Sequence, residues 1–457
     1  MSRGISRRAL LGGVAGGLAL APVVAGPAIA KPYAAAGARE PYVPFAVGAG
    51  GGPAGTDRVR VLKVGSDAAP TVLVMVPGMF GAAGDFRLLA RDLVAAVPGV
   101  QVWAFDRREE NLADRSGFAG ADPAAYYLDG HYRSQDPAAS GFAARWGLAR
   151  TLEDLDTVVR AASCGGRRRV VLGGHSWGAT TTMAYAAWDF DGRPGHRGLA
   201  GLVLVDGGVR GAFDGTGAPV LDSPDEVRER LAAIDGGAVF DLTLSGVGLG
   251  SRAESTQIWY QLAGWYAHHD PDGRSVLQPR MPDALRPSVP VTNAALLGVL
   301  VDAGFGWPND ISVHSGHLGE SGSDGVRGWV DEGITPLGRV AEAYAGGPAP
   351  AVWEWYWPAR LSVDLDVTDA YADTDLARSL GLRLRHGTGL DTPLYVFETS
   401  YAKGTIVSSA RRVVADSRIP YATYRTDEGM NHLDPLFAAE AHNTLTRTLA
   451  PFLAGLV

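Results

Sequence analysis

The chain has 457 residues, of which 46% are hydrophobic and 20% are charged. This apolar fraction excludes a disordered chain, and the length is sufficient to bury one large core or two ordinary ones. Acidic residues outnumber Lys and Arg by 49 to 41, and the resulting net charge of −8 leaves no basic surplus for nucleic-acid phosphates. The 61 glycines lack the Gly-X-Y period of collagen and are expected in turns and close backbone approaches.

Residues 1–30 have the composition of an export signal. A positively charged start precedes an apolar stretch and a small-residue cleavage signature at Ala28-Ile29-Ala30. Ser6-Arg7-Arg8-Ala9-Leu10-Leu11 is similar to twin-arginine signals, which export folded proteins. We therefore expect a secreted, periplasmic or cell-surface protein, with an uncleaved N-terminal anchor as the alternative. Removal of this segment takes away three Arg and no acid, so the net charge changes from −8 to −11.

An exported chain with a single cysteine must be stable without disulfides. Cys164 has no partner in the sequence, so the core alone must stabilise the fold. After residue 30 no apolar run reaches about 18 residues, and no stable membrane span is expected once the signal is removed.

The mature chain begins with a Gly-, Pro- and Ala-rich stretch, residues 31–56, which is expected to be a flexible lead-in. Apolar runs typical of strands then alternate with segments of helical period. The predicted strands are Val59–Val64, Thr71–Val76, Val100–Phe105, Arg169–Leu172 and Leu202–Val205, and the predicted helices are Phe86–Val97, Leu148–Ala162 and Trp177–Trp188. Wholly apolar strands that alternate with helices predict a mostly parallel sheet covered on both faces.

This alternation fades at Gly207 and returns near the C-terminus. The later elements are the predicted strands Leu394–Phe397 and Tyr421–Tyr424 and a closing helix near Asp434–Leu453. The sequence therefore predicts an α/β core of residues 57–206 and 392–457, interrupted by an insert of residues 207–391. There is no internal repeat.

One motif in the core carries nucleophilic chemistry. Gly174-His175-Ser176-Trp177-Gly178 has the pattern G-x-S-x-G and lies between a predicted strand and a predicted helix. A serine on such a sharp turn is exposed at the C-terminal edge of the sheet, and the helix that follows offers backbone N–H groups to a developing oxyanion. Ser176 is thus the predicted nucleophile.

At this point the core resembles the α/β-hydrolase superfamily. The resemblance covers the core but not the insert, and it implies a serine hydrolase of the secreted esterase or lipase type with a cap inserted after the sixth strand. The oxyanion loop of that family follows an early strand, here Val76-Pro77-Gly78-Met79-Phe80-Gly81, where Pro77 replaces the usual His. The backbone N–H of Met79 or Phe80, together with that of Trp177, would match the oxyanion donors.

The resemblance also implies a general base and an acid. His432, in Gly429-Met430-Asn431-His432-Leu433-Asp434-Pro435, occupies the position after the last strand and before the final helix. Two acids remain open. Glu398 ends the next-to-last strand, and Asp206 ends the strand before it, as in some lipases.

The insert is the expected source of specificity. Its large aromatics suit an apolar or aromatic group on an ester substrate, and the candidates for contact are Trp259, Trp265, Trp353, Trp355 and Trp357. The apolar stretch Ala294–Val301 is either a lid helix or a buried helix.

The predicted reaction is carboxylic ester hydrolysis through an acyl-enzyme on Ser176. No metal or organic cofactor is expected, because the histidine pairs His268-His269 and His314-x-x-His317 lack a third ligand at zinc spacing. The alternatives are an amidase or aminopeptidase similar to proline iminopeptidases and a non-catalytic binding protein on the same fold. An aminopeptidase needs a carboxylate for the substrate amine, and Glu254, Asp302 and Glu354 are the candidates.

Overall fold

The structure is a computed structural model of the whole chain. It describes residues 40–218, 223–245, 252–283, 286–305, 311–345, 351–369 and 373–457. The predicted export signal and the first nine residues of the predicted lead-in lie outside the described residues.

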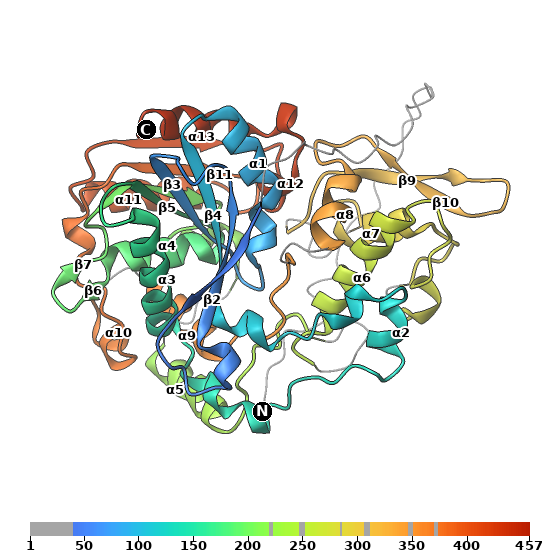
Figure 1. Cartoon of the computed structure of the whole chain (residues 1–457), viewed down its shortest axis with the longest axis horizontal. Helices are drawn as coiled ribbons and strands as arrows, with labels where there is room; N and C mark the ends of the chain where they lie inside the picture. The colour runs from blue at the N-terminus through green and yellow to red at the C-terminus, as the bar shows by residue number, and fades with distance from the viewer. Residues whose placement is uncertain are drawn as a thin grey trace.

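A central eight-stranded sheet organises the molecule (Figure 1). The strand order is β1-β2-β4-β3-β5-β8-β11-β12, and all neighbouring strands from β4 to β12 in this order are parallel, whereas β1 and β2 run antiparallel at one edge. The strands are β1 Tyr42–Ala46, β2 Arg58–Val64, β3 Thr71–Val76, β4 Val100–Asp106, β5 Arg169–His175, β8 Leu199–Val205, β11 Leu394–Glu398 and β12 Ala422–Thr426. This arrangement confirms the predicted mostly parallel sheet.

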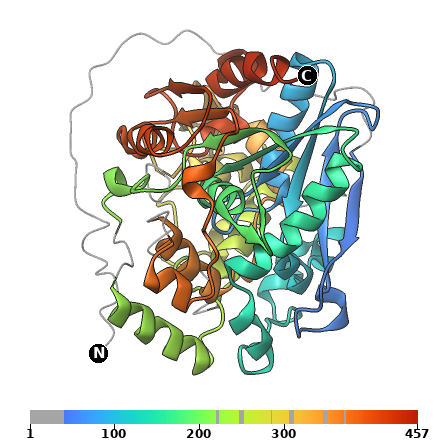
Figure 2. The ribbon, with the colours of Figure 1, turned by 90° about the vertical axis from the view of Figure 1, so that its left-hand side faces the viewer.

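Helices cover both faces of the sheet (Figures 1 and 2). Helices α1 and α13 pack on one face, and α3, α4, α9 and α11 pack on the other. Their bounds are α1 Arg87–Ala96, α3 Leu148–Ser163, α4 Trp177–Ala187, α9 Ala359–Asp369, α11 Thr405–Ala415 and α13 Thr444–Ala454. Successive strand residues point to opposite faces, so each wholly apolar strand supplies both cores. In β3, for example, Leu73 and Met75 belong to one core, and Val72, Val74 and Val76 belong to the other.

Part of the predicted lead-in is a strand of the sheet. Residues 42–46 form β1, and Tyr42 through Ala46 pair with Leu62 through Arg58 of β2. The segment YVPFA offers an apolar face to the core, and its proline is tolerated because β1 is an edge strand. The glycine-rich composition around it concealed this short strand.

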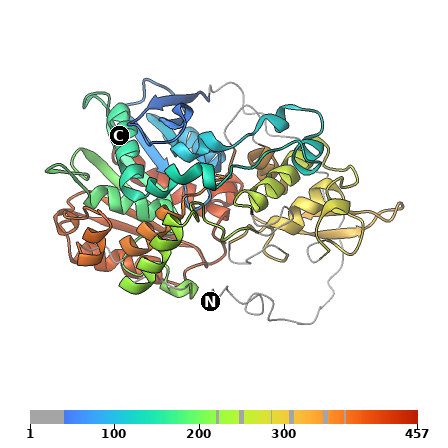
Figure 3. The same ribbon diagram turned by 90° about the horizontal axis from the view of Figure 1, so that it is seen from below.

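The insert divides into two parts in space. Helices α6 Ser255–His269, α7 Asn293–Val301 and α8 Leu337–Ala345 and the hairpin β9 Gly316–Ser321 and β10 Arg327–Asp331 form a lobe beside the sheet (Figures 1 and 3). Helix α2 Pro123–Leu128, which comes from the core segment of the sequence, packs against α6. The remaining elements lie with the core helices: α5 Pro224–Asp235 contacts α9, and α10 Asp375–Ser379 contacts α9 as well.

The last elements are shorter than the sequence predicts. The single closing helix expected near Asp434–Leu453 is instead α12 Asp434–Phe437, a short 3-10 turn and α13. A two-residue hairpin, β6 Asp189–Phe190 and β7 Arg193–Pro194, follows α4. Within the described part of the chain, no helix is both long enough and apolar enough to cross a membrane.

Candidate active site

Ser176 occupies a sharp turn between β5 and α4. Its backbone has φ 55° and ψ −130°, a conformation that costs energy for a non-glycine residue and that is found at functional sites. Small neighbours make the turn possible. A Cβ on Gly174 would lie 2.1 Å from the carbonyl oxygen of Gly178, and a Cβ on Gly178 would lie 1.9 Å from that of Val76. The two glycines of the G-x-S-x-G motif are therefore required by close backbone packing.

Two further glycines allow other loops to approach Ser176. A Cβ on Gly78, in the loop after β3, would lie 2.8 Å from the Ser176 Cβ and 3.4 Å from its Oγ. A Cβ on Gly207, just after β8, would lie 2.2 Å from the Ser176 carbonyl oxygen. The C-terminal ends of β3, β5 and β8 thus converge on one serine, as expected for adjacent parallel strands.

His432 pairs with Asp206. The His432 Nδ1 lies 2.6 Å from the Asp206 Oδ2, and both side chains are almost completely buried. Thr399 holds this carboxylate from the other side, because its backbone N–H donates to Oδ1 at 2.8 Å and its hydroxyl donates to Oδ2 at 2.6 Å. Asp206 has a φ of 49°, so the strand end is bent sharply at this residue. A buried carboxylate on Nδ1 leaves Nε2 as the ring nitrogen available for proton transfer.

Glu398, the other acid that the sequence left open, lies elsewhere. Its carboxylate accepts hydrogen bonds from the first backbone N–H groups of α11. The donors are the N–H groups of Gly404 at 2.7 Å, Ile406 at 3.2 Å and Val407 at 2.8 Å. Burial raises the pKa of Glu398, and these N–H groups oppose that rise. The structure brings Asp206, and not Glu398, to His432.

The His432 ring is enclosed by two other rings. The His175 ring centroid is 4.4 Å away and that of Tyr401 is 4.3 Å away. The His175 Nε2 also lies 2.9 Å from the His432 carbonyl oxygen. Burial, followed by the neighbouring His432, lowers the pKa of His175 to about 3, so His175 is neutral at physiological pH. The neutral ring therefore fastens the loop after β12 to the turn that carries Ser176.

The loop after β3 contains the predicted oxyanion donors. Met79 is partly buried, and Phe80 is buried with a φ of 57°. Trp177 begins α4, where backbone N–H groups have no partner within the helix. The Phe80 and Trp177 rings both approach Trp357, with centroid distances of 5.8 and 6.2 Å. One indole of the insert thus packs against both segments that carry the predicted donors.

The other aromatics of the insert make extensive protein contacts. Trp259 and Trp355 are at most 1% exposed, and Trp355 packs edge-on against Tyr127 and Tyr132. Trp353 is partly buried, and Trp265 stacks on His269 at the end of α6. These contacts account for the aromatics as packing residues. Substrate contact by Trp259, Trp265, Trp353, Trp355 and Trp357 stays a prediction.

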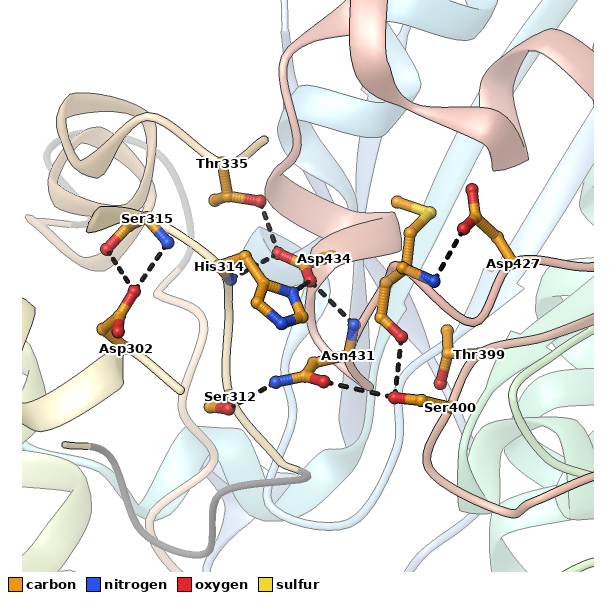
Figure 4. A network of polar contacts seen from close by, with 12 residues as sticks. Asp302, Ser312, His314, Ser315, Thr335, Thr399, Ser400, Asp427, Asn431 and Asp434 are labelled. Carbon is orange, nitrogen blue, oxygen red and sulfur yellow. Dashed lines mark hydrogen bonds and ion pairs between the residues drawn. The ribbon is translucent and has the colours of Figure 1, made fainter. Parts of the chain in front are cut away.

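A polar network joins the insert to the loop that carries His432 (Figure 4). The fully buried Asp434 accepts from two residues of the insert: the His314 backbone N–H at 2.9 Å and the Thr335 hydroxyl at 2.6 Å. The His314 Nδ1 also lies 2.7 Å from the Asp434 Oδ2. On its own loop, Asp434 accepts from the Asn431 backbone N–H at 2.7 Å. Asn431 in turn donates to Ser312 at 2.9 Å. Sequence reasoning missed this network, because His314 and Asp434 are 120 positions apart.

The acidic and basic loop after β4 is also buried close to the site. Asp106 accepts from the Ala83 N–H at 2.5 Å, and burial raises its pKa to about 6. Arg108 donates to Asp154 of α3 at 2.7 and 2.8 Å, whereas Arg107 turns toward the loop after β3. The two arginines of this loop thus contact different parts of the chain, the loop after β3 and helix α3.

The three carboxylates considered for a substrate amine already have partners. Asp302 accepts from both polar groups of Ser315, Glu354 pairs with Arg107 at 2.9 Å, and one oxygen of Glu254 accepts from Tyr132 at 3.0 Å. Across the described ranges, no group of three His, Cys, Asp or Glu residues has an arrangement that could hold a metal ion.

Comparisons with known proteins agree with this architecture. No protein-family model matches the sequence, and neither does any curated protein. Among solved structures, a provisionally assigned lipase from Sulfolobus solfataricus is similar over 91% of this chain and 93% of its own, with a TM-score of 0.50 and 15% identity. A lipase in an open form shows weaker similarity, with a TM-score of 0.43 and 14% identity over 92% of this chain and 99% of its own. An epoxide hydrolase from an endophytic Streptomyces has a TM-score of 0.42 and 15% identity over 92% of this chain and 96% of its own.

This chain has the α/β-hydrolase fold. The G-x-S-x-G motif lies on a sharp strand-to-helix turn, which is its usual context in this fold. The predicted fold class is therefore confirmed for the mostly parallel, helix-covered sheet, whereas the cap insert and the roles of individual residues stay predictions.

Proposed function

We propose that the protein is an exported serine hydrolase that cleaves carboxylic esters. The observation that carries the proposal is the buried His432–Asp206 pair, which lies at the same sheet edge as a serine held in a strained turn. A neutral imidazole whose Nδ1–H is held by a carboxylate is the usual partner of a serine nucleophile.

The reaction follows from these three side chains. His432 takes the Ser176 proton as Oγ attacks the ester carbonyl, and the resulting imidazolium is stabilised by Asp206. His432 then gives its proton to the leaving alcohol, and an acyl group remains on Ser176. Water, activated by the same histidine, attacks the acyl-enzyme and releases the acid. The negative charge on the tetrahedral intermediate would be bound by the N–H of Met79 or Phe80 and that of Trp177.

The aromatic residues of the insert support a substrate with an apolar or aromatic group. Trp357 is fully buried and packs against both predicted donor segments, and Trp353 is partly buried, so these indoles make the surroundings of the predicted oxyanion loop apolar. Such a small-molecule ester is compatible with the location outside the cytoplasm that the N-terminal segment predicts.

Covalent labelling tests this function directly. A fluorophosphonate probe should label the wild-type protein at Ser176, and p-nitrophenyl esters should be hydrolysed. Ser176→Ala should lose both properties while keeping its circular dichroism spectrum. Ser408→Ala, at an exposed serine of α11, is the matched control and should keep both. Turnover retained in Ser176→Ala would refute the nucleophile, and faster cleavage of amides than of matched esters would refute the ester class.

A further inference from the structure

We infer that Arg107 and Glu354 form a clamp that positions the loop after β3, residues 77–81, next to Ser176. The inference rests on the proposed function, because the loop matters for catalysis only if its N–H groups bind an oxyanion. Neither residue touches Ser176, so both are positioning residues that act through the loop.

Arg107 binds the loop at both ends. One terminal nitrogen donates to the Pro77 carbonyl at 2.5 Å, and the other lies 3.4 Å from the Gly81 carbonyl. The guanidinium carbon also lies 4.6 Å from the centre of the Trp357 ring. The side chain is 2% exposed, so these hydrogen bonds face little competition from water. The two predicted donors, Met79 and Phe80, lie between the two carbonyls that Arg107 holds.

Glu354 completes the clamp from the insert. Its side chain accepts from Arg107 at 2.9 Å, and its backbone N–H donates to the Phe80 carbonyl at 2.7 Å. The residues before it run along the loop as a strand would. The Ala82 N–H donates to the Val352 carbonyl at 2.8 Å, and Gly81 pairs with Trp353. The insert therefore contacts the loop after β3 through backbone hydrogen bonds.

A second carboxyl group shares the Arg107 environment. The side chain of Glu109 is buried close to that of Glu354 and repels it electrostatically. Two buried carboxylates that repel each other favour protonation of one of them. Burial raises the pKa of both groups, and Arg107 opposes the rise. One such proton would leave a single negative charge opposite Arg107.

Other charged groups around the cluster have their own contacts. Glu110 pairs with Arg115, and burial raises its pKa to about 8. Arg108, which faces Glu109, is paired with Asp154. Coulombic repulsion from Glu110 also acts on Glu354. Arg107 is the cation that pairs directly with Glu354, so loss of a proton from the Glu109–Glu354 pair would add a negative charge to the clamp.

The clamp has a defined catalytic consequence. Oxyanion donors contribute only when they are fixed before the reaction, and loss of one donor typically lowers kcat by about 10²–10³-fold. Phe80 is held at φ 57°, which an unconstrained phenylalanine rarely adopts. A loosened loop should therefore lower kcat with little change in KM, because the donors act on the transition state.

The test compares two neighbouring arginines of equal burial. Arg107→Lys keeps the charge but cannot reach both carbonyls. Arg108→Lys alters the contacts with Asp154, Asp57 and the Gly48 carbonyl, none of which lies in the loop after β3, and is the matched control. Arg107→Lys should lower kcat at least tenfold at nearly constant KM and should speed hydrogen–deuterium exchange in peptides covering residues 77–84. Arg108→Lys should leave the kcat and the exchange of this loop as in the wild type. Glu354→Gln serves as the second variant if Arg107→Lys does not fold.

The pH profile gives an independent readout. The wild-type kcat should fall at alkaline pH as the Glu109–Glu354 pair loses its proton. In Glu109→Gln the pair has no shared proton to lose, so this fall should be absent. Unchanged exchange of residues 77–84 in both Arg107→Lys and Glu354→Gln would overturn the clamp. Hydrogen–deuterium exchange needs no substrate, so it tests the clamp independently of ester hydrolysis. Failure to hydrolyse esters would refute the proposed function and would leave the exchange result unaffected.

Discussion

Substitution of the two buried acids at neighbouring strand ends, Asp206 and Glu398, tests which of them acts with His432. Asp206→Asn replaces the carboxylate that lies 2.6 Å from the His432 Nδ1. An amide nitrogen at this position would face the imidazole N–H, so the ring would turn to the tautomer with its proton on Nε2, where it cannot accept the Ser176 proton. In serine hydrolases with this arrangement, the same change lowers kcat by about 10⁴-fold.

The fold should tolerate Asp206→Asn. The amide oxygen can keep the bond from the Thr399 N–H at 2.8 Å, and the Thr399 hydroxyl can rotate to accept from the new amide. Glu398→Gln should behave in the opposite way. One of its three backbone donors at the start of α11 would lose its acceptor, which costs about 1–3 kcal/mol of stability. Its kcat should change little, because Glu398 does not contact His432.

Two measurements separate these outcomes. Initial rates on a p-nitrophenyl ester give kcat and KM, and urea unfolding followed by circular dichroism gives the free energy of unfolding. Asp206→Asn should lose activity and keep stability, and Glu398→Gln should lose stability and keep activity. If Glu398→Gln loses more activity than Asp206→Asn while folded, the assignment of the acid from geometry is refuted.

Two further predictions follow from contacts around the site. Gly78→Ala places a Cβ 2.8 Å from the Ser176 Cβ, so the loop after β3 or the serine must move. The kcat should fall at least tenfold while the circular dichroism spectrum stays unchanged. A normal rate would show that catalysis does not need the close contact between this loop and Ser176. The hydrogen bond to Asp434 raises the pKa of His314, so this contact stabilises the fold fully below the unfolded-state pKa of about 6.5 and is lost as pH rises through the folded-state value. Urea midpoints measured between pH 5 and 9 should therefore decline less steeply in His314→Gln than in the wild type, and identical slopes would contradict the contribution of this pair.

The sequence alone determined the features that depend on residues close together in the chain, namely the strands and the turn at Ser176. The apolar runs fall within β2, β3, β4, β5, β8 and β11, because strands of a buried parallel sheet need apolar side chains on both faces. Gly174 and Gly178 around Ser176 follow from the packing of one turn, which five residues encode. The chain position of His432 followed from the resemblance to the hydrolase fold.

Tertiary structure decided which of two acids in similar local sequence contacts His432. Asp206 and Glu398 both end apolar strands that lie side by side, and only the fold shows that one faces His432 and the other faces the N-terminus of α11. The same holds for the clamp, since Arg107 and Glu354 are 247 positions apart. Hydrophobic periodicity indicates which side chains are buried, but it does not indicate which distant segment covers them. In this protein the distant segments decide the partners of Asp206, of Glu398 and of the loop beside Ser176.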